Sequence, residues 1–432
     1  MSLTTPTKLE KLQQALGTKA KQEPSYRFYQ LYDKVYREDV LATAYAHCRQ
    51  KNGAPGVDGQ RFTDIAAYGE ERWLSELREE LRQERYRPQA VRRVLIPKPG
   101  GVGERPLGIP TIRDRVAQTA ARLVLEPIFE ADFDEAAYGY RPGRGALAAV
   151  KEVHQALRQG QTQVVDADLS SYFDTIPHAE LMKCLARRIS DGKMLRLIKL
   201  WLKAPVAEKD DQGRPRLTGG KRSTRGIPQG GAISPLLANV YMHRFIRAFR
   251  RYGLAQRYGA KLVNYADDFV ILCRHGAAQV LTTVRKWMGQ IGLTINERKT
   301  TVRRAWQEAF DFLGYTFGRL YSPKRRCFYL GARPSTKASK RLREKVHGHL
   351  HRGVVAPWDE VVSGLNRTLK GWGNYFRYGT VTPTRHALDR YVCGRVRDFQ
   401  RRRHKLSTRG WRSTRMTEYT PNLASRLWWT SR

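Results

Sequence analysis

The spacing of hydrophobic and polar residues predicts β-strands in three parts of the chain. In residues 162–176 (TQVVDADLSSYFDTI), Val165, Ala167 and Leu169 share one face of a strand, and Asp166 and Asp168 share the other. Residues 261–272 (KLVNYADDFVIL) hold two short apolar runs with a pair of acids between them, a pattern typical of a β-hairpin. Residues 92–109 form a second candidate hairpin around a Gly-rich loop.

Apolar residues that recur every three or four positions predict helices elsewhere. A polar, helical lead-in opens the chain, and the main helices are expected over residues 25–50, about 70–85, 114–129, 178–203 (two helices) and 234–249. Near the C-terminus, three more helices are expected from apolar residues at Ala338, Leu342, Val346 and Leu350, at Val361, Leu365 and Leu369, and at Leu388, Val392, Val396 and Phe399.

The two adjacent acids of the central hairpin are the first candidate for chemistry. Asp267 and Asp268 stand side by side, and like charges held together are costly unless a cation compensates them. A solvated Asp-Asp turn is the alternative. A third carboxylate, Asp168 from a neighbouring strand, would complete a site for two divalent ions about 3.5–4 Å apart, as in phosphoryl transfer. Mg²⁺ suits such hard oxygen ligands.

Charge is the strongest signal in the composition. The chain has 79 Lys or Arg against 40 Asp or Glu, a net charge of +39, which predicts salt-sensitive binding to nucleic acid. From Arg319 to Arg432 the count is 27 basic against 6 acidic residues, which accounts for +21 of the total. An anionic membrane is the weaker alternative, since the apolar residues are used for helix cores and no run is long enough to span a bilayer.

Five widely separated cysteines without a C-x-x-C pair indicate a reducing cytosol and no zinc module. The loop between Pro97 and Arg105 lacks the G-K-[ST] ending of a P-loop, so nucleotide hydrolysis of that type is excluded. In residues 223–249, Gly230 and Gly231 allow a close backbone approach to a ligand, and Ser234 is predicted to cap a helix with Pro235 at its first position.

Several blocks together resemble the reverse transcriptases encoded by group II introns. They are YADD (265–268), with Asp168 and then Phe173 upstream, NGAPGVDG (52–59), AYGYRPGRG (137–145), PQGGAISP (228–235) and LKGWGNYFRYG (369–379). The resemblance covers about residues 25–400, in the order of the family. It implies an α+β right-hand polymerase, with fingers and an antiparallel palm sheet, followed by a helical thumb or maturase domain X.

The resemblance implies four domains and assigns roles to single residues. The expected domains are an N-terminal extension (1–65), fingers and palm (66–320), thumb (321–400) and a basic nucleic-acid-binding tail (401–432). Asp168, Asp267 and Asp268 would be the catalytic metal ligands, for two Mg²⁺ ions that Mn²⁺ could replace, with deoxynucleoside triphosphates as substrates. Nucleotide contacts are implied for Lys98, Arg105, Phe173, Gln229 and Lys299, and Phe173 would exclude a 2′-hydroxyl.

The implied function is RNA-directed DNA synthesis by a group II intron protein that also assists splicing and target-primed mobility. The implied partners are the intron RNA, an RNA template with a DNA primer, and target DNA, with no membrane, in the bacterial cytosol. The chain shows no His-Asn-His-type endonuclease block, so we expect no second-strand cleavage. A maturase with secondary polymerase activity and a domesticated enzyme of host defence or repair stay open as alternatives, and so does the oligomeric state.

Overall fold

The computed structural model describes residues 7–97, 103–209 and 214–403. The chain forms two compact units, one from Met1–Gly145 with Val165–Val302 and the other from Ala146–Val164 with Arg303–Arg432. The chain therefore passes from one unit to the other three times. The domains predicted at 1–65, 66–320, 321–400 and 401–432 describe functional parts, and their boundaries stay a prediction; most of the predicted tail lies outside the described residues.

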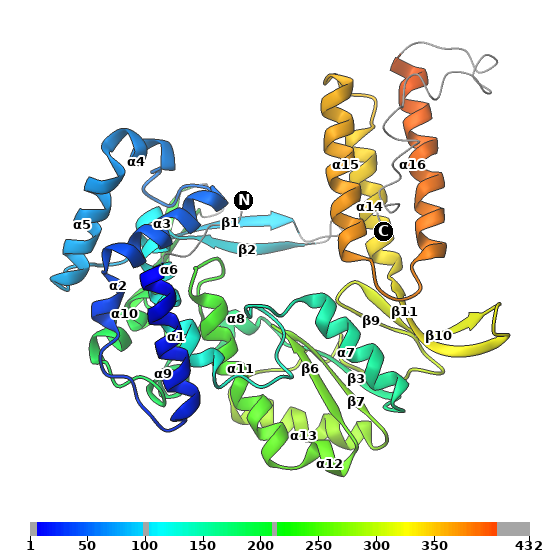
Figure 1. Cartoon of the computed structure of the whole chain (residues 1–432), viewed down its shortest axis with the longest axis horizontal. Helices are drawn as coiled ribbons and strands as arrows, with labels where there is room; N and C mark the ends of the chain where they lie inside the picture. The colour runs from blue at the N-terminus through cyan, green and yellow to red at the C-terminus, as the bar shows by residue number, and fades with distance from the viewer. Residues whose placement is uncertain (1–6, 98–102, 210–213, 404–432) are drawn as a thin grey trace. The chain divides into compact units, whose positions relative to one another are not determined.

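Helices from the N-terminal part of the chain gather around one long helix of the first unit, with α1, α2 and α3 in direct contact with it (Figure 1). The helices are α1 (Thr7–Gln22), α2 (Tyr32–Val35), α3 (Glu38–Lys51), α4 (Phe62–Tyr68), α5 (Glu70–Arg82) and the long α6 (Ile112–Glu130). Nearly every side of α6 is buried, because α1, α2 and α3 all lie against it. The helices predicted near 70–85 and 114–129 are confirmed.

The helix predicted over 25–50 is wrong in its first part. Residues 25–31 are not helical, and Phe28 forms a parallel bridge with Ile189. The N–H of Phe28 donates to the carbonyl of Arg188 at 2.8 Å, and its own carbonyl accepts from the N–H of Ser190 at 2.8 Å. Pairing with a distant segment thus satisfies this backbone in place of helical hydrogen bonds.

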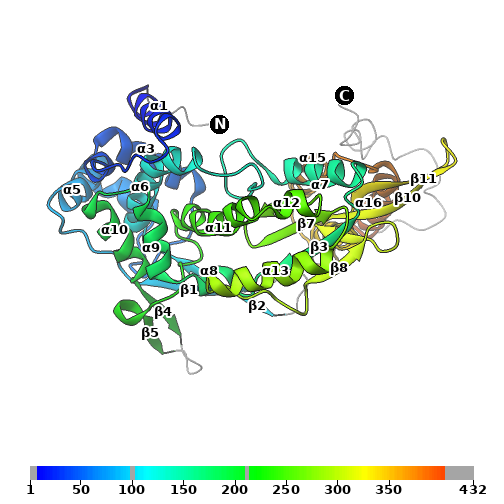
Figure 2. The same cartoon turned by 90° about the horizontal axis from the view of Figure 1, so that it is seen from below.

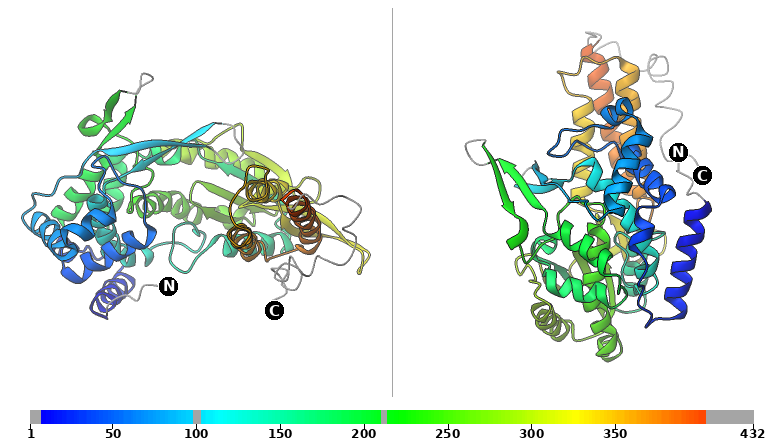
Figure 3. Two further views of the ribbon diagram at one scale, coloured as in Figure 1. Left: turned by 90° about the horizontal axis from the view of Figure 1, so that it is seen from above. Right: turned by 90° about the vertical axis from the view of Figure 1, so that its left-hand side faces the viewer.

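A four-stranded sheet contains the predicted Gly-rich hairpin of residues 92–109. Its strands are β1 (Val91–Pro97), β2 (Glu104–Ile109), β4 (Pro205–Lys209) and β5 (Pro215–Gly219), in the order β2-β1-β4-β5. β1 and β2 are antiparallel with Val94 opposite Leu107, which confirms the hairpin. Figure 3 shows the β4–β5 hairpin projecting from the helices of this unit.

The second sheet of this unit carries the acidic hairpin. Its strands are β3 (Gln163–Asp168), β6 (Lys261–Tyr265), β7 (Asp268–Cys273) and β8 (Thr301–Arg304), in the order β6-β7-β3-β8. Both predicted strand regions are confirmed, and β3 lies directly beside β7. The sheet order therefore places Asp168, the last residue of β3, on the strand next to β7, which begins at Asp268.

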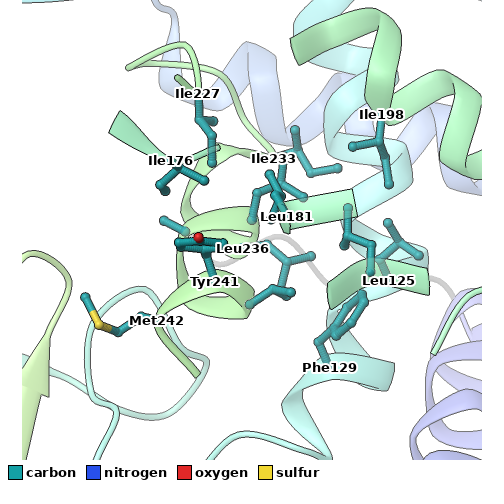
Figure 4. Close-up of a cluster of buried hydrophobic side chains, with 14 of the residues drawn as sticks. Leu125, Phe129, Ile176, Leu181, Ile198, Ile227, Ile233, Leu236, Tyr241 and Met242 are labelled. Atoms are coloured by element: carbon teal, nitrogen blue, oxygen red, sulfur yellow. The ribbon is translucent and has the colours of Figure 1, made fainter. Parts of the chain in front are cut away.

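Helices complete the hydrophobic core around this sheet (Figure 2). They are α8 (Tyr172–Thr175), α9 (His178–Ala186), α10 (Gly192–Leu202), the 3₁₀ turn η1 (Gly220–Arg222), α11 (Ser234–Arg251), α12 (Leu254–Arg257) and α13 (Ala277–Gln290). Figure 4 shows buried side chains of α6, α9 and α10 gathered around Leu236 and Tyr241 of α11. α11 thus runs through the core. Packing at several points along this helix holds it in place, and its N-terminus with it.

The second unit pairs a small sheet with a bundle of three helices. It contains α7 (Ala146–Arg158), β9 (Phe310–Phe312), β10 (Tyr315–Ser322), β11 (Cys327–Pro334), α14 (Thr336–His349), α15 (Trp358–Tyr375) and α16 (Thr382–Arg403). The bundle core consists of Leu342, Val346, Leu350, Val361, Leu365, Leu369, Leu388, Val392, Val396 and Phe399. All ten residues were predicted from helical periodicity, so the three C-terminal helices are confirmed. Within the described residues, no helix is both long and apolar enough to cross a bilayer.

Candidate active site

The turn between β6 and β7 presents the two adjacent acids. Tyr265 pairs with Asp268 across the hairpin, so Ala266 and Asp267 form a two-residue turn. Ala266 adopts a positive φ of 59°, as such a turn requires. The side-chain amide of Asn264 donates to the carbonyl of Ala266 at 2.9 Å and stabilises this conformation.

The loop that contains Tyr138 and Gly139 packs against the turn between β6 and β7. A Cβ atom at Gly139 would lie 2.5 Å from the backbone nitrogen of Ala266, so only glycine allows this approach. The N–H of Tyr138 donates to the carbonyl of Asn264 at 2.8 Å, and the side chain of Asn239 donates to the carbonyl of Gly139 at 2.8 Å. The AYGYRPGRG block therefore holds the acidic turn rigidly against α11.

Asp168, at the end of β3, is held by two side chains from one loop. Lys299 Nζ lies 2.9 Å from Asp168 Oδ2, and Asn296 Nδ2 donates to the same oxygen at 3.3 Å. The backbone N–H of Asn296 also donates to the carbonyl of Asp168 at 2.8 Å. This hydrogen bond from the Lys299 ammonium to the carboxylate raises the pKa of Lys299.

Repulsion among the acids shows that the site is short of positive charge. Burial by surrounding atoms, and then the charges of Asp267 and Asp168, raise the pKa of Asp268 to about 7. The Asp268 residue is still accessible to solvent, so this burial is partial. A carboxyl group in this position is stabilised as an anion only when a cation approaches it.

The donor set at this site fits Mg²⁺. Carboxylate oxygens are the ligands that this hard ion prefers, and it is usually held by one or two carboxylates together with substrate phosphates and water. Within the described residues, no three His, Cys, Asp or Glu side chains are arranged so that they could hold a metal ion by themselves. Asp168, Asp267 and Asp268 could therefore supply part of a coordination shell that substrate completes.

A cavity of about 420 Å³ in the same unit collects most of the residues predicted to contact the nucleotide. Arg105, Phe173 and Gln229 line it together with Tyr140, which meets Phe173 edge to face at 6.3 Å between ring centroids. Lys98 lies outside the described residues. Lys299 does not line this cavity, and it contacts Asp168 instead.

Sequence reasoning missed Asn296, Tyr140 and Asp174. Asp174 accepts from Gln229 Nε2 at 3.2 and 3.1 Å through its two oxygens, which turns Gln229 Oε1 toward Arg105 Nε at 3.5 Å. Burial and the charge of Asp267 raise the pKa of Tyr140, whose φ of 58° is also unusual. The only sequence signal for a functional role was that Asp174 lies in the motif YFD, Tyr140 in GYRPG and Asn296 in INERK.

The loop of PQGG is pressed against strand β2 of the Gly-rich hairpin. The N–H of Gly108 donates to the carbonyl of Gln229 at 2.6 Å. The predicted cap at Ser234 is wrong: α11 begins at Ser234 itself, and its hydroxyl donates back to the carbonyl of Pro228 at 2.7 Å. The hydroxyl therefore closes the PQGG loop and leaves the helix N-terminus uncapped by this side chain.

Asp174→Ala is expected to raise the KM for the incoming nucleotide by about 10-fold to 100-fold, the range typical of partners that orient a ligand-binding group. The loss would come from the freed amide of Gln229, while kcat should change little. Single-nucleotide incorporation at varied nucleotide concentration measures both constants. Asp33→Ala, which removes a carboxylate paired with Lys34 on the surface, is the control and should leave KM unchanged.

Comparison with known proteins identifies the class of this chain. A model of the family "Reverse transcriptase (RNA-dependent DNA polymerase)" matches residues 96–317, slightly more than half of the chain. A model of the "Group II intron, maturase-specific domain" matches residues 339–417. The chain is therefore a member of the reverse transcriptases, the RNA-directed DNA polymerases.

Similar proteins narrow this class. The chain is 35% identical to Protein YkfC of Escherichia coli (strain K12), over 71% of this chain and 87% of that protein. It is 34% identical to the group II intron-encoded protein LtrA of Lactococcus lactis subsp. cremoris, over 50% of this chain and 34% of that protein. The chain belongs to the group II intron type of reverse transcriptase with a maturase domain, and the predicted family, fold and enzyme class are confirmed.

Proposed function

We propose that this chain copies an RNA template into DNA at a site built from Asp168, Asp267 and Asp268. The observation that carries the proposal is the meeting of three carboxylates at the ends of neighbouring strands, with the pKa of Asp268 raised to about 7. The metal would be Mg²⁺, in two ions, and Mn²⁺ could replace it. The substrates would be deoxynucleoside triphosphates, a DNA primer and an RNA template.

In the reaction, the 3′-oxygen of the primer attacks the α-phosphate, the bond to the β-phosphate breaks, pyrophosphate leaves, and the 3′-hydroxyl proton passes to solvent. Divalent ions, when bound, would activate the attacking oxygen and stabilise the leaving one. Lys299 and Asn296 keep Asp168 oriented toward the acidic turn. Arg105 would hold the triphosphate through its planar fork, with Lys98 as a second cation in the same hairpin.

The nucleotide cavity also supports selection of the sugar. Phe173 lies in the short helix α8, directly after β3, and its ring forms part of the cavity wall. Its residue is 7% exposed, so packing fixes the ring, and a rigid wall can reject an added hydroxyl by steric exclusion.

Phe173→Val is expected to weaken the preference for deoxynucleotides over ribonucleotides by about 100-fold, because an opened pocket wall no longer rejects the extra oxygen. Competing incorporation of the two nucleotide types on one template measures this ratio. Phe173→Tyr keeps the ring and should keep the ratio. Equal ratios in Phe173→Val and the wild type would show that another residue selects the sugar.

We infer that the second unit contributes the contacts to intron RNA, since its three-helix bundle lies in the maturase-specific match. Splicing assistance and target-primed mobility would then use the same chain, in the bacterial cytosol, with target DNA as a further partner. A domesticated role in host defence or repair is the alternative, and it would use the same polymerase site with other RNAs.

Primer extension on an RNA template tests the proposal directly. The purified protein should extend an annealed DNA primer with deoxynucleotides when Mg²⁺ is present, and chelation of divalent ions should stop it. A DNA template of the same sequence separates a dedicated reverse transcriptase from a general polymerase. A wild-type protein that folds but never extends the primer, with Mg²⁺ or Mn²⁺, would refute the proposed reaction.

A further inference from the structure

A second and larger cavity of the first unit, of about 1220 Å³, lies along the C-terminal half of α11. It shares no lining residue with the nucleotide cavity. Its walls come from α11, from the ends of α9 and α13, and from the segment after α6. We name it the arginine groove, after six arginines that line it together with two aspartates.

Half of these arginines are neutralised by acids of the same unit. Arg188 is buried, and it also donates to the backbone carbonyls of Ala20 and Tyr26, so its role is to fix the N-terminal segment. The three neutralised arginines are Arg188 with Asp132 at 3.1 Å, Arg250 with Asp134 at 2.9 Å, and Arg244 with Glu180 at 3.0 Å. The two aspartates of the groove are therefore each paired at close range with another arginine, and Arg247 acts on Asp132 only through its charge at longer range.

The remaining arginines, Arg187, Arg247 and Arg251, are exposed and form no ion pair with any residue that the structure describes. Cations at the end of α11 stabilise its helix dipole, which is the simpler explanation for Arg251. The same explanation applies to Arg187, which is the C-cap residue of α9, but it is weaker for Arg247, which lies a full turn before the end of α11. Three unpaired guanidinium groups from two elements thus face one groove.

Aromatic side chains line the same groove. Tyr252 is 65% exposed, and its ring lies 5.4 Å from that of Trp287 at an interplanar angle of 40°. Nearby, His243 Nδ1 is buried without a hydrogen-bond partner among the described residues. Burial and the charge of Arg247 lower the pKa of His243 to about 4, so the ring is neutral and can still donate or accept one hydrogen bond.

We propose that the arginine groove binds an unpaired segment of RNA, with phosphates on the three free arginines and a base against Tyr252 and Trp287. Its volume exceeds the roughly 300–1,000 Å³ of small-molecule pockets, which favours a polymer. Aromatic rings stack only on bases that are not paired, which favours a single strand or a loop over a duplex. This inference rests on the proposed function in one respect, that RNA is the polyanion on which the chain acts.

The groove is separate from the polymerase site. Ser234 at the start of α11 lines the nucleotide cavity, and Arg247 lies thirteen residues further along the same helix. At 1.5 Å per residue the two ends of this stretch are about 20 Å apart. An RNA held in the groove would therefore leave the nucleotide cavity free. A protein that binds one part of an RNA while it copies another part needs such a separation.

The experiment measures RNA binding with the polymerase site already filled by a short primer–template at saturating concentration. The probe is a hairpin RNA with about ten unpaired loop nucleotides, within the range of single-strand binding sites. Arg187→Gln, Arg247→Gln and Arg251→Gln are combined in one variant. Loss of three phosphate contacts should weaken binding at least about tenfold and reduce the slope of log K against log salt by about two.

The control variant combines Arg85→Gln, Arg257→Gln and Arg274→Gln, three exposed arginines outside the groove that change the net charge equally. Its salt slope should stay close to that of the wild type. Photo-crosslinking of iodouridine in the loop should label the peptides that contain Tyr252 or Trp287, in the wild type and in the control. Primer extension on the short template should be equal in all three proteins.

Four results would overturn the inference. Equal losses of RNA affinity in the groove and control variants would mean that binding depends only on net charge. A loss of the same size on an RNA duplex without a loop would exclude an unpaired segment as the ligand. Equal binding of single-stranded DNA would remove the assignment to RNA, and displacement by polyglutamate at matched charge would indicate an acidic peptide partner. None of these results affects primer extension, so failure of this inference and failure of the proposed polymerase remain distinguishable.

Discussion

Asp268→Asn is expected to reduce primer extension by a factor of at least about 10³. Mutation of a residue that only orients a metal ligand already costs about 10-fold to 100-fold in metal affinity or activity, and a direct ligand should cost more. The substitution keeps the shape of the side chain and removes one anionic oxygen from the turn. It also removes the cost of burying the charge and the repulsion from the other acids, which together raise the pKa of Asp268, so the variant should unfold at the same or a higher temperature without divalent ions. Extension rates and thermal unfolding together measure both effects.

Asp166→Asn is the matched control for this experiment. Asp166 lies two residues before Asp168 on the same strand, and of the three acids that raise the pKa of Asp268 it has the weakest effect. We expect this variant to keep most of the activity. A dead Asp268→Asn protein that also unfolds at a much lower temperature would indicate a structural role for the carboxylate and contradict the assignment.

The three acids could be found from the sequence because strand alternation and a two-residue turn depend on local patterns alone. The same holds for the bundle core, in which all ten residues follow helical periodicity. The position of β3 beside β7, which brings Asp168 to the hairpin, was inferred because a third carboxylate would complete a metal site, and the family resemblance supported it. No periodicity within a single segment specifies which strands become neighbours.

Residues whose function depends on distant partners were not found. Asp174 and Asn296 are polar residues in short turns, and only the folded chain brings them to Gln229 and Asp168. The wrong cap at Ser234 and the wrong helix before Leu31 have the same cause, since a tertiary hydrogen bond replaces the local one in both places. The arginine groove draws its walls from four segments, so its existence is a property of the fold.

Gly230→Ala is the second variant for which we expect a large loss, about 100-fold in nucleotide incorporation, comparable to misplacing a catalytic contact by 1 Å. Gly230 has a φ of 114°, and a Cβ atom there would lie 2.1 Å from the carbonyl oxygen of Gly108. Because that oxygen belongs to the backbone of β2, the strand itself must move. The displacement would break the 2.6 Å hydrogen bond from Gly108 to Gln229 and shift Arg105, which lies on the same strand.

Gly219→Ala separates this steric effect from the cost of the backbone conformation. Gly219 also has a positive φ, of 71°, but a Cβ atom there would meet nothing within 4 Å. Gly219 has a ψ of −127°, so its alanine variant should lose only the roughly 1–3 kcal/mol that an L-residue needs in such a sparsely populated backbone conformation. Single-nucleotide kinetics and thermal unfolding of both variants measure the difference. Equal losses would mean that the contact between the PQGG loop and β2 does not position the nucleotide site.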